Sequence, residues 1–345
     1  MSQAHVKPAR FVRCDPEMAT SQLFVPLSKA RQRPPLQFTI ESKSGLKRLR
    51  FSAREALGIP EQTLFLVLLE LAQEHYGTRP AELTVINPTR AQGLSAYLWQ
   101  TLHDGHPVNS GESIYVQTTW YEVGHRCGSL GGRARHLRRE QLQRLSEVVV
   151  WEEDDEAQNA FRQSRLVSVW LGDDRVLHLA VNVRLARAIM GGQYVPVSLR
   201  ERLELATDTA QALHASLSAR IRFGHSWRFG VDTLVHQLYP GSDAAPGGTL
   251  RRRRKLVRDA LEQVGGLLGW SVEWVANQVA LVTRKPFKVD GVTRRERPRM
   301  QPAVLHAFQT PPNPRDCADV FDATRFLEGV TDSPPSWTIG HNHGD

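Results

Sequence analysis

The chain has 345 residues and a formal net charge of +8, and its pI of about 9.7 predicts a polyanionic partner such as nucleic acid. Hydrophobic residues make up 41% of it, which is enough for one or two packed cores and excludes a wholly disordered chain. The N-terminus has no secretion-signal pattern and the longest apolar run, Leu64–Leu69, is too short for a membrane span, so a soluble cytoplasmic protein with no membrane partner is expected.

The basic residues are mostly arginine, with 37 arginines to 7 lysines. Arginine forms bidentate contacts with phosphates and guanine edges, although a GC-rich genome would produce the same bias. The three cysteines, Cys14, Cys127 and Cys317, lack the spacing of a metal site or of a disulfide framework. We therefore expect free thiols, no bound metal and no cofactor.

Residues 1–35 are basic and rich in proline and are predicted to form an arm. A first domain is predicted over residues 36–181. It begins with extended segments at Leu36–Glu41 and Lys47–Phe51, whose Ser-Gly connection predicts a hairpin. A helix is predicted from Pro60 to Tyr76, ended by Gly77. Residues 78–113 show no clear pattern apart from a helix predicted at Leu94–Leu102.

The rest of this domain predicts a helix, a turn, a basic helix and a β hairpin. The helices are expected at Thr118–Arg126 and Gly132–Ser146. The second should bury one side and expose the other; the buried side is formed by Ala134, Leu137, Leu142, Leu145 and Val148, and the exposed side by Arg135, His136, Arg139 and Gln143. A β-rich segment at 148–151, an acidic loop at 152–156 and strands at 166–171 and 176–181 follow.

The same order of elements recurs in a second domain predicted over residues 182–287. Helices are expected at Thr209–Ile221 and Val231–Tyr239, and a Gly-Pro-rich loop then leads to Thr249, the expected N-cap of a basic helix. Strands at 270–275 and 279–283 surround a turn at Asn277-Gln278. We see no repeat at the level of residues, only this repeated order.

The basic helix carries an apolar stripe formed by Leu250, Val257, Leu261, Val264 and Leu268, whose spacing is that of a helix with one buried face. At about 100° per residue, Arg251, Arg252, Lys255 and Arg258 lie opposite or beside the stripe. Arg253 and Arg254 flank it, where long side chains can pack. Asp259 and Glu262 limit the basic surface to the first turns. A solvated charged face is the alternative interpretation of the run by itself.

Two such units predict an α+β protein with tandem winged helices, each a helix-turn-helix followed by a β wing. The expected function is binding of double-stranded DNA through phosphate neutralisation and arginine contacts to bases. The second basic helix and its wing supply most of the predicted contacts: Thr249, Arg251, Arg252, Arg254, Lys255, Arg258, Asn277, Gln278, Arg284 and Lys285. The first basic helix supplies Arg133, Arg135, Arg138 and Arg139. A purely structural hairpin is the alternative for the wing.

Catalytic signals are weak. The sequence has no phosphate-binding G-x-x-x-x-G-K-[ST] motif, which argues against an ATPase or helicase. His341 and His343 resemble the metal pair of rolling-circle nickases only superficially, because Asn342 stands between them where an apolar residue is expected. They belong to the Pro- and Arg-rich tail at 288–345, which we expect to be disordered apart from a weak helix at 319–327. The protein is therefore not expected to be an enzyme.

Several of these segments resemble the RepC-type replication initiators of IncQ-like broad-host-range plasmids. The similarity covers roughly residues 10 to 287 and is most specific in the second half. It is carried by Leu179-Ala180-Val181-Asn182, Ala188-Ile189-Met190-Gly191-Gly192, the helix Asp208 to Leu213 with His214, Val231-Asp232-Thr233-Leu234, Arg251 to Ala260 and Leu268-Gly269-Trp270, with a fainter match at Val12-Arg13-Cys14-Asp15-Pro16. The tail has no counterpart.

The resemblance implies a non-enzymatic initiator with tandem winged helices. Such an initiator binds directly repeated iterons at a plasmid origin, promotes melting of an AT-rich region and helps load a plasmid-encoded helicase. Arg251 to Lys255 and Arg258 match by residue, whereas the first basic helix matches by position. A host initiator and a second copy of the chain are further expected partners. The alternatives are a winged-helix transcriptional regulator and, from a different class, an origin nickase.

Overall fold

The computed structural model describes residues 11–27, 32–41, 47–106, 110–129, 131–154, 160–172, 176–242 and 245–286. They belong to one compact unit bounded by Met1 and Lys288, with the mixed helix and sheet content expected from the sequence. The predicted tail at 288–345, including Cys317, His341, His343 and the weak helix, lies outside the described residues.

The hairpin predicted near the N-terminus is confirmed and forms part of a larger sheet. Strands β2 (Leu36–Glu41) and β3 (Lys47–Ala53) pair antiparallel and continue into β6 (Val149–Asp154) and β7 (Ala160–Arg165), in the order β2-β3-β6-β7. Residues 152–154 therefore lie in a strand, not in the predicted acidic loop; residues 155 and 156 are outside the described ranges. Partners on both sides of β6 keep these carboxylate-bearing residues extended.

A second antiparallel sheet has the order β4-β5-β9-β8 and contains the predicted hairpin at 166–181. Strands β8 (Val167–Leu171) and β9 (Val176–Val181) pair as expected, but β9 also pairs with β5 (Ser113–Thr119) and β5 with β4 (Val85–Ile86). The sequence prediction missed β4 and β5. The strands after the first basic helix are thus shared between two sheets and do not form one isolated hairpin.

Helices cover these sheets close to the predicted positions. The long helix α2 (Ile59–Thr78) runs past Gly77, and α3 (Ala81–Thr84) follows it. Helix α4 (Leu94–Leu102) has the predicted bounds. Helix α5 (Trp120–Arg126) begins later than predicted, because the Thr119 hydroxyl caps it by accepting the Glu122 N–H.

Helix α6 (Gly132–Ser146) also has the predicted bounds, and Leu142, Leu145 and Val148 are buried as expected. Leu137 is 45% exposed and does not join the core, contrary to the predicted apolar side. The helix contacts α2, α5 and β8, and its buried residues all lie in its second half.

The predicted N-terminal arm is wrong for residues 11–27. Strand β1 (Phe11–Cys14) pairs with β10 (Val195–Ser198), and α1 (Pro16–Thr20) follows, capped by the Asp15 carboxylate. Val12 and Cys14 are buried on one side of β1, and Met18 is buried in α1. Burial of these apolar side chains holds the segment against the core. The rest of the predicted arm is described only over residues 32–35.

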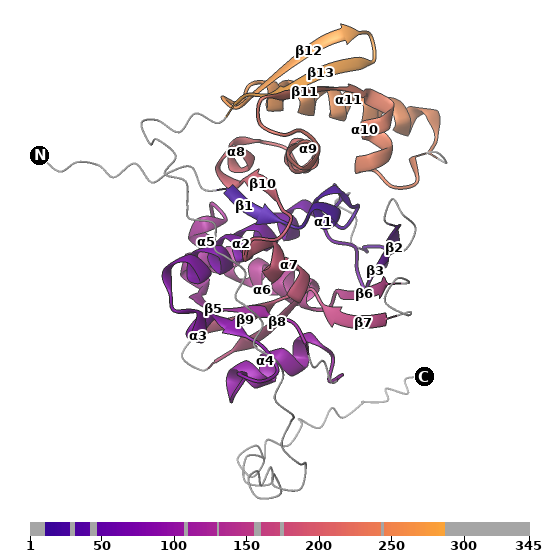
Figure 1. The fold of residues 1–345 in the computed structure, drawn as a ribbon. Coiled ribbons are helices and arrows are strands. Elements are labelled where there is room, and N and C mark those ends of the chain that lie inside the picture. The colour runs from indigo at the N-terminus through magenta and orange to yellow at the C-terminus, as the bar shows by residue number, and fades with distance from the viewer. Residues whose placement is uncertain are drawn as a thin grey trace, which may run out of the picture. The chain divides into compact units, whose positions relative to one another are not determined.

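The last third of the unit is a helical layer with a small sheet (Figure 1). After α7 (Val183–Ile189) and α8 (Leu199–Glu204), its elements are α9 (Asp208–Arg220), β11 (His225–Gly230), α10 (Val231–Leu238), α11 (Gly247–Gly265), β12 (Trp270–Ala276) and β13 (Val279–Arg284). The sheet has the order β11-β13-β12 and is antiparallel. The predicted helices before α11 and the wing strands are confirmed within one residue, α11 begins three residues earlier than predicted, and β11 was missed.

Apolar side chains from both predicted domains belong to one continuous hydrophobic cluster, which includes Leu145 of α6, Leu213 of α9 and Val257 of α11. Helix α11 packs against α9, α10 and β12. None of the helices in the described ranges is long and apolar enough to cross a membrane.

Candidate nucleic-acid interface

Helix α11 has the buried face that its sequence predicts. Val257, Ala260, Leu261 and Val264 are buried completely against the rest of the unit. The helix ends at Gly265, so Leu268 lies beyond it and is 91% exposed, contrary to the predicted stripe. The helix also begins earlier than predicted, because Pro246 is its N-cap; Thr249 is an exposed residue of the first turn and not the cap.

The opposite face of α11 is basic and carries cations without a hydrogen bond or ion pair among the described residues. Arg251, Arg252 and Lys255 are exposed, and none of them forms a hydrogen bond or ion pair with another residue in the described part of the chain. Guanidinium and ammonium groups without protein partners can exchange solvent counterions for phosphates at little cost. These three side chains therefore form the basic face of the candidate interface.

Arg254, a predicted DNA contact, forms a partly exposed ion pair with a residue of the neighbouring helix. Its Nε and Nη2 donate to Oδ1 and Oδ2 of Asp232 in α10, at 2.6 and 3.0 Å. This bidentate pair lowers the pKa of the Asp232 carboxyl. The ion pair joins α11 to α10, so Arg254 supports the position of the helix; its predicted contact with DNA stays a prediction.

Arg253 joins the same helix to the preceding loop. Its Nη1 donates to the Ser242 hydroxyl at 2.8 Å, and its guanidinium lies 5.2 Å from the centre of the Tyr239 ring. The long side chain thus packs beside the apolar stripe, as its flanking position predicts.

The turn between β12 and β13 is connected to α11 by Arg258. Its Nη2 donates to the Asn277 carbonyl at 2.8 Å, and its guanidinium lies 5.7 Å from the centre of the Trp274 ring. Asn277, Gln278 and the more distant Lys285 are exposed, as their predicted role requires. The turn therefore has a fixed attachment to α11.

The expectation that Arg284 contacts DNA is wrong, because its side chain is only 1% exposed. Its Nη1 donates to the carbonyls of Ser218 and Ile221 at 3.0 and 3.3 Å, and its Nη2 donates to the Pro196 carbonyl at 2.8 Å. The guanidinium also lies 3.9 Å from the centre of the Phe223 ring. Burial lowers the Arg284 pKa to about 10. Arg284 therefore anchors β13 to α9 and β10.

A second buried connection, which the sequence analysis missed, lies beside Arg284. Glu201 Oε2 accepts a hydrogen bond from Trp270 Nε1 at 3.0 Å and lies 3.0 Å from His214 Nε2. Burial raises the Glu201 pKa, but these two partners bring it below its ordinary value. A Cβ at Gly269 would come within 2.6 Å of Glu201 Oε1, so only glycine allows this approach. In the sequence, this connection was indicated by the family resemblance at Leu268-Gly269-Trp270.

The first basic helix, α6, presents a smaller exposed set. Arg133, Arg135 and Arg139 are exposed, whereas Arg138 donates to the side chains of Gln141 and Ser129 at 2.7 and 2.9 Å. Arg138 thus joins α6 to the preceding turn, and its predicted DNA contact stays a prediction. The two basic helices lie in different layers, since α6 packs on α2 and α11 packs on α9.

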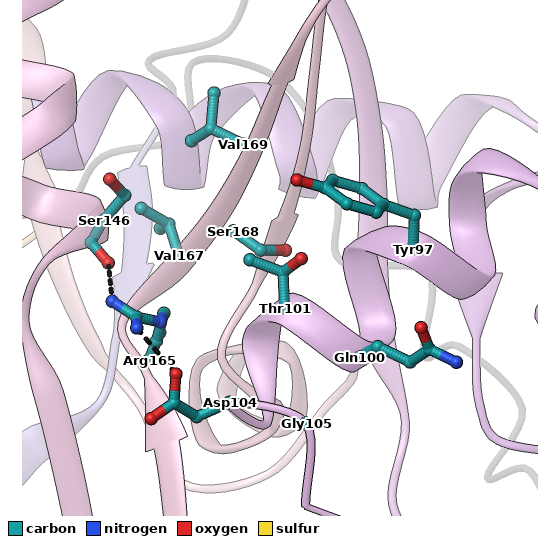
Figure 2. Close-up of a pocket in the computed structure, with 10 residues that line it drawn as sticks. All are labelled: Tyr97, Gln100, Thr101, Asp104, Gly105, Ser146, Arg165, Val167, Ser168 and Val169. Atoms are coloured by element: carbon teal, nitrogen blue, oxygen red, sulfur yellow. Dashed lines mark hydrogen bonds and ion pairs between the residues drawn. The ribbon is translucent and has the colours of Figure 1, made fainter. Parts of the chain in front are cut away.

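The cavities found among the described residues do not suggest catalysis. A cavity of about 370 Å³ lies between α4 and β8, with Tyr97 and Thr101 on one side and Val167 and Val169 on the other (Figure 2). Among its lining residues Arg165 donates to Asp104 at 2.6 Å, so these two charges are paired. Among the described residues no group of three His, Cys, Asp or Glu side chains could hold a metal ion.

The cysteines in the described ranges are free and buried. Burial raises the pKa of Cys14 to about 12 and that of Cys127 to about 11. Neither thiol is therefore placed to act as a nucleophile at neutral pH.

Three comparisons place the chain among known proteins. The model of the family described as Replication protein C (RepC) matches residues 9–285. No curated protein matches. Among solved structures, two crystal structures of domains 2 and 3 of RctB are similar in part. The selenomethionine form has a TM-score of 0.43 and 10% identity, and the form spanning RctB residues 155–483 has a TM-score of 0.45 and 11% identity. Each covers 76% of this chain and 95% of the other.

Proposed function

We propose that this chain, which belongs to the RepC family of replication proteins by its match over residues 9–285, initiates replication by binding double-stranded DNA through α11 and the β12–β13 turn. Family membership supports the role of a replication initiator. The finer features are our proposal: a plasmid of the IncQ-like type, binding of directly repeated iterons, melting of an adjacent AT-rich region and loading of a plasmid-encoded helicase. We also propose that the protein acts without catalytic chemistry of its own.

The observation that carries the proposal is the basic face of α11. Arg251, Arg252 and Lys255 project from the first turns of a helix whose other side is packed on α9. Cations that bind phosphates release the counterions condensed on the DNA, and these three side chains have no hydrogen bond or ion pair to give up among the described residues. Asp259 and Glu262 are exposed farther along, so the attraction to DNA is confined to the N-terminal half of the helix.

The order of the surrounding elements supports a winged-helix interpretation. Helix α9 is followed by β11, α10, α11 and the β12–β13 hairpin, and the three strands form one antiparallel sheet. In this interpretation α10 and α11 form the helix-turn-helix, α11 enters the major groove and the hairpin is the wing. The Arg254–Asp232 pair and the Arg258 contact would hold both elements at a fixed angle.

Helix α6 is proposed as a second DNA-contacting helix through Arg133, Arg135 and Arg139. It follows α5 after a short turn, so the pair has the same helix-turn-helix order. Two such helices on one chain suit an asymmetric, directly repeated site better than a palindrome, which favours a two-fold dimer. A second copy, a host initiator and the helicase remain proposed partners.

The test is a binding titration on the origin of the replicon that encodes the chain, with a scrambled duplex of the same composition as competitor. Specific binding to the repeats, with footprints over whole repeats, is the expected result. Protection of only half a repeat would contradict the use of two helices, and equal binding to the scrambled duplex would contradict specific recognition.

The alternatives make different predictions. A transcriptional regulator with the same fold would bind a promoter site without an array of repeats beside an AT-rich segment. An origin nickase would relax supercoiled origin plasmid in the presence of a divalent metal. We expect no relaxed product, and its formation would overturn the non-enzymatic proposal.

A further inference from the structure

The end of strand β12 exposes two consecutive large apolar residues. Trp274 is 42% exposed and Val275 is 47% exposed. The pairing shifts here, since Trp274 pairs with Ala280 but Ala276 pairs with Val279, which leaves Val275 without a partner in the ladder. A bulge of this kind bends the strand and redirects its side chains. Trp274 and Val275 are therefore presented by a local irregularity of the strand.

The position of this pair is fixed relative to the basic face of α11. The Arg258 guanidinium lies 5.7 Å from the centre of the Trp274 ring and donates to the Asn277 carbonyl three residues farther on. Arg258 follows Arg251 by seven residues, which is about two helical turns and nearly the same side of the helix. Trp274 and Val275 therefore border the row of cations that we propose to contact phosphates.

An exposed apolar pair beside a cationic face matches a known way of deforming DNA. Proteins that bend or open a duplex place apolar side chains between base steps from the minor groove, while nearby cations neutralise the backbone. Exposed aromatic rings without nearby cations would instead suit a protein partner. At the end of β12 the Arg258 guanidinium lies 5.7 Å from the centre of the Trp274 ring, and this contact with α11 favours duplex DNA as the occupant.

We propose that Trp274 and Val275 form an apolar wedge, which enters the minor groove beside the α11 contact and partly unstacks the base step that it reaches. This inference rests on the proposed DNA binding by α11 and adds the chemistry that weakens base stacking. The wedge acts on the duplex that α11 has already bound, so it contributes a contact to bases and not to phosphates.

A matched control residue lies on the same sheet. Trp227 of β11 is 58% exposed, more than Trp274, but it belongs to the opposite edge strand and pairs with Val282. Trp227 has no described contact with an arginine of α11. A general effect of removing an exposed tryptophan would therefore appear in both variants, whereas the wedge predicts an effect of Trp274 alone.

The experiment uses the full chain and an origin-repeat duplex with 2-aminopurine at successive positions, titrated at several salt concentrations. Trp274→Ala should weaken binding roughly tenfold, in the range of an aromatic–base contact, and abolish the 2-aminopurine signal of unstacking. The slope of log affinity against log salt should not change, because an apolar contact releases no counterions. Trp227→Ala should bind with the same affinity as the unsubstituted chain and give the same unstacking signal. Val275→Ser should reduce the unstacking signal while leaving the Arg258–Trp274 contact in place.

The outcomes separate the wedge from the DNA-binding function. If the unsubstituted chain bound no duplex, both would be refuted. If it bound the repeats while Trp274→Ala and Val275→Ser left the unstacking signal intact, only the wedge would be refuted. The wedge would also be refuted if Trp274→Ala caused no further loss of binding in a chain that already carried Arg258→Gln. Trp274 would then act by positioning Arg258.

Discussion

Replacing Arg251, Arg252 and Lys255 together by alanine should reduce the salt dependence of DNA binding by a predictable amount. All three side chains are exposed and lack partners in the described part of the chain, so each is expected to neutralise one phosphate. Each neutralised phosphate contributes about 0.9 to the slope of log affinity against log salt, so the triple variant should lose about 2.7 from the slope.

The loss can be measured as a ratio of affinities. Raising salt from about 50 to about 200 mM should weaken the unsubstituted chain roughly 40-fold more than the triple variant, because each contact contributes about 3.5-fold over that range. Fluorescence anisotropy on a labelled repeat duplex at several salt concentrations gives both slopes. The thermal unfolding midpoint should stay unchanged, since none of the three side chains is packed.

Arg200→Ala is the control, because the Arg200 side chain is 86% exposed on α8, where it pairs with Glu204 at 3.5 Å, and it is not part of the proposed interface. It removes one positive charge from the protein without removing a proposed contact, so its slope should equal that of the unsubstituted chain. A triple variant with the original slope would show that α11 does not contact phosphates. Equal slope losses for Arg200→Ala and for each single α11 variant would indicate a general effect of net charge.

Three further outcomes follow from the contacts within the unit. Leu261→Ala should lower the free energy of unfolding by ~2–5 kcal/mol in a urea titration, because Leu261 is fully buried on the apolar face of α11. Arg254→Ala and Asp232→Asn should weaken repeat binding to a similar extent, and the double variant no further; a salt slope reduced by about one for Arg254→Ala alone would show that Arg254 does reach a phosphate. Stability should fall as pH decreases from about 6.5 to about 4. Burial lowers the pKa of His75 and His103 to about 4, so in this range the unfolded chain binds more protons than the folded one. Unfolding titrations at pH 7 and pH 5 check this, and His103→Gln should reduce the difference; an unchanged difference would exclude His103 as a source.

The sequence predicted much of the local structure around the candidate interface. The spacing of Val257, Leu261 and Val264 placed one face of α11 in the core, and the structure buries all three. The turn at Asn277-Gln278 located the hairpin within one residue. Both signals come from residues close together in the chain, where helical periodicity and turn chemistry act directly.

Strands were predicted less well than helices because a strand depends on distant partners. Strand β11 pairs with β13 more than fifty residues later, and β1 pairs with β10. The alternation of buried and exposed residues in β1 is only four residues long, and proline-rich sequence surrounds it. Only the presence of β10 beside it makes this segment part of the core.

The roles of individual arginines were decided by tertiary structure. The sequence by itself determined that the first turns of α11 are basic and that one side of the helix is apolar. It gave no means to separate Arg251, which is exposed, from Arg254, which is paired with Asp232 on a neighbouring helix. The buried Arg284 guanidinium donates to backbone carbonyls of residues 63, 66 and 88 positions earlier in the chain, and these contacts keep it away from DNA. Whether a guanidinium meets solvent or carbonyl oxygens depends on which distant segments the fold brings beside it, and no local pattern records that.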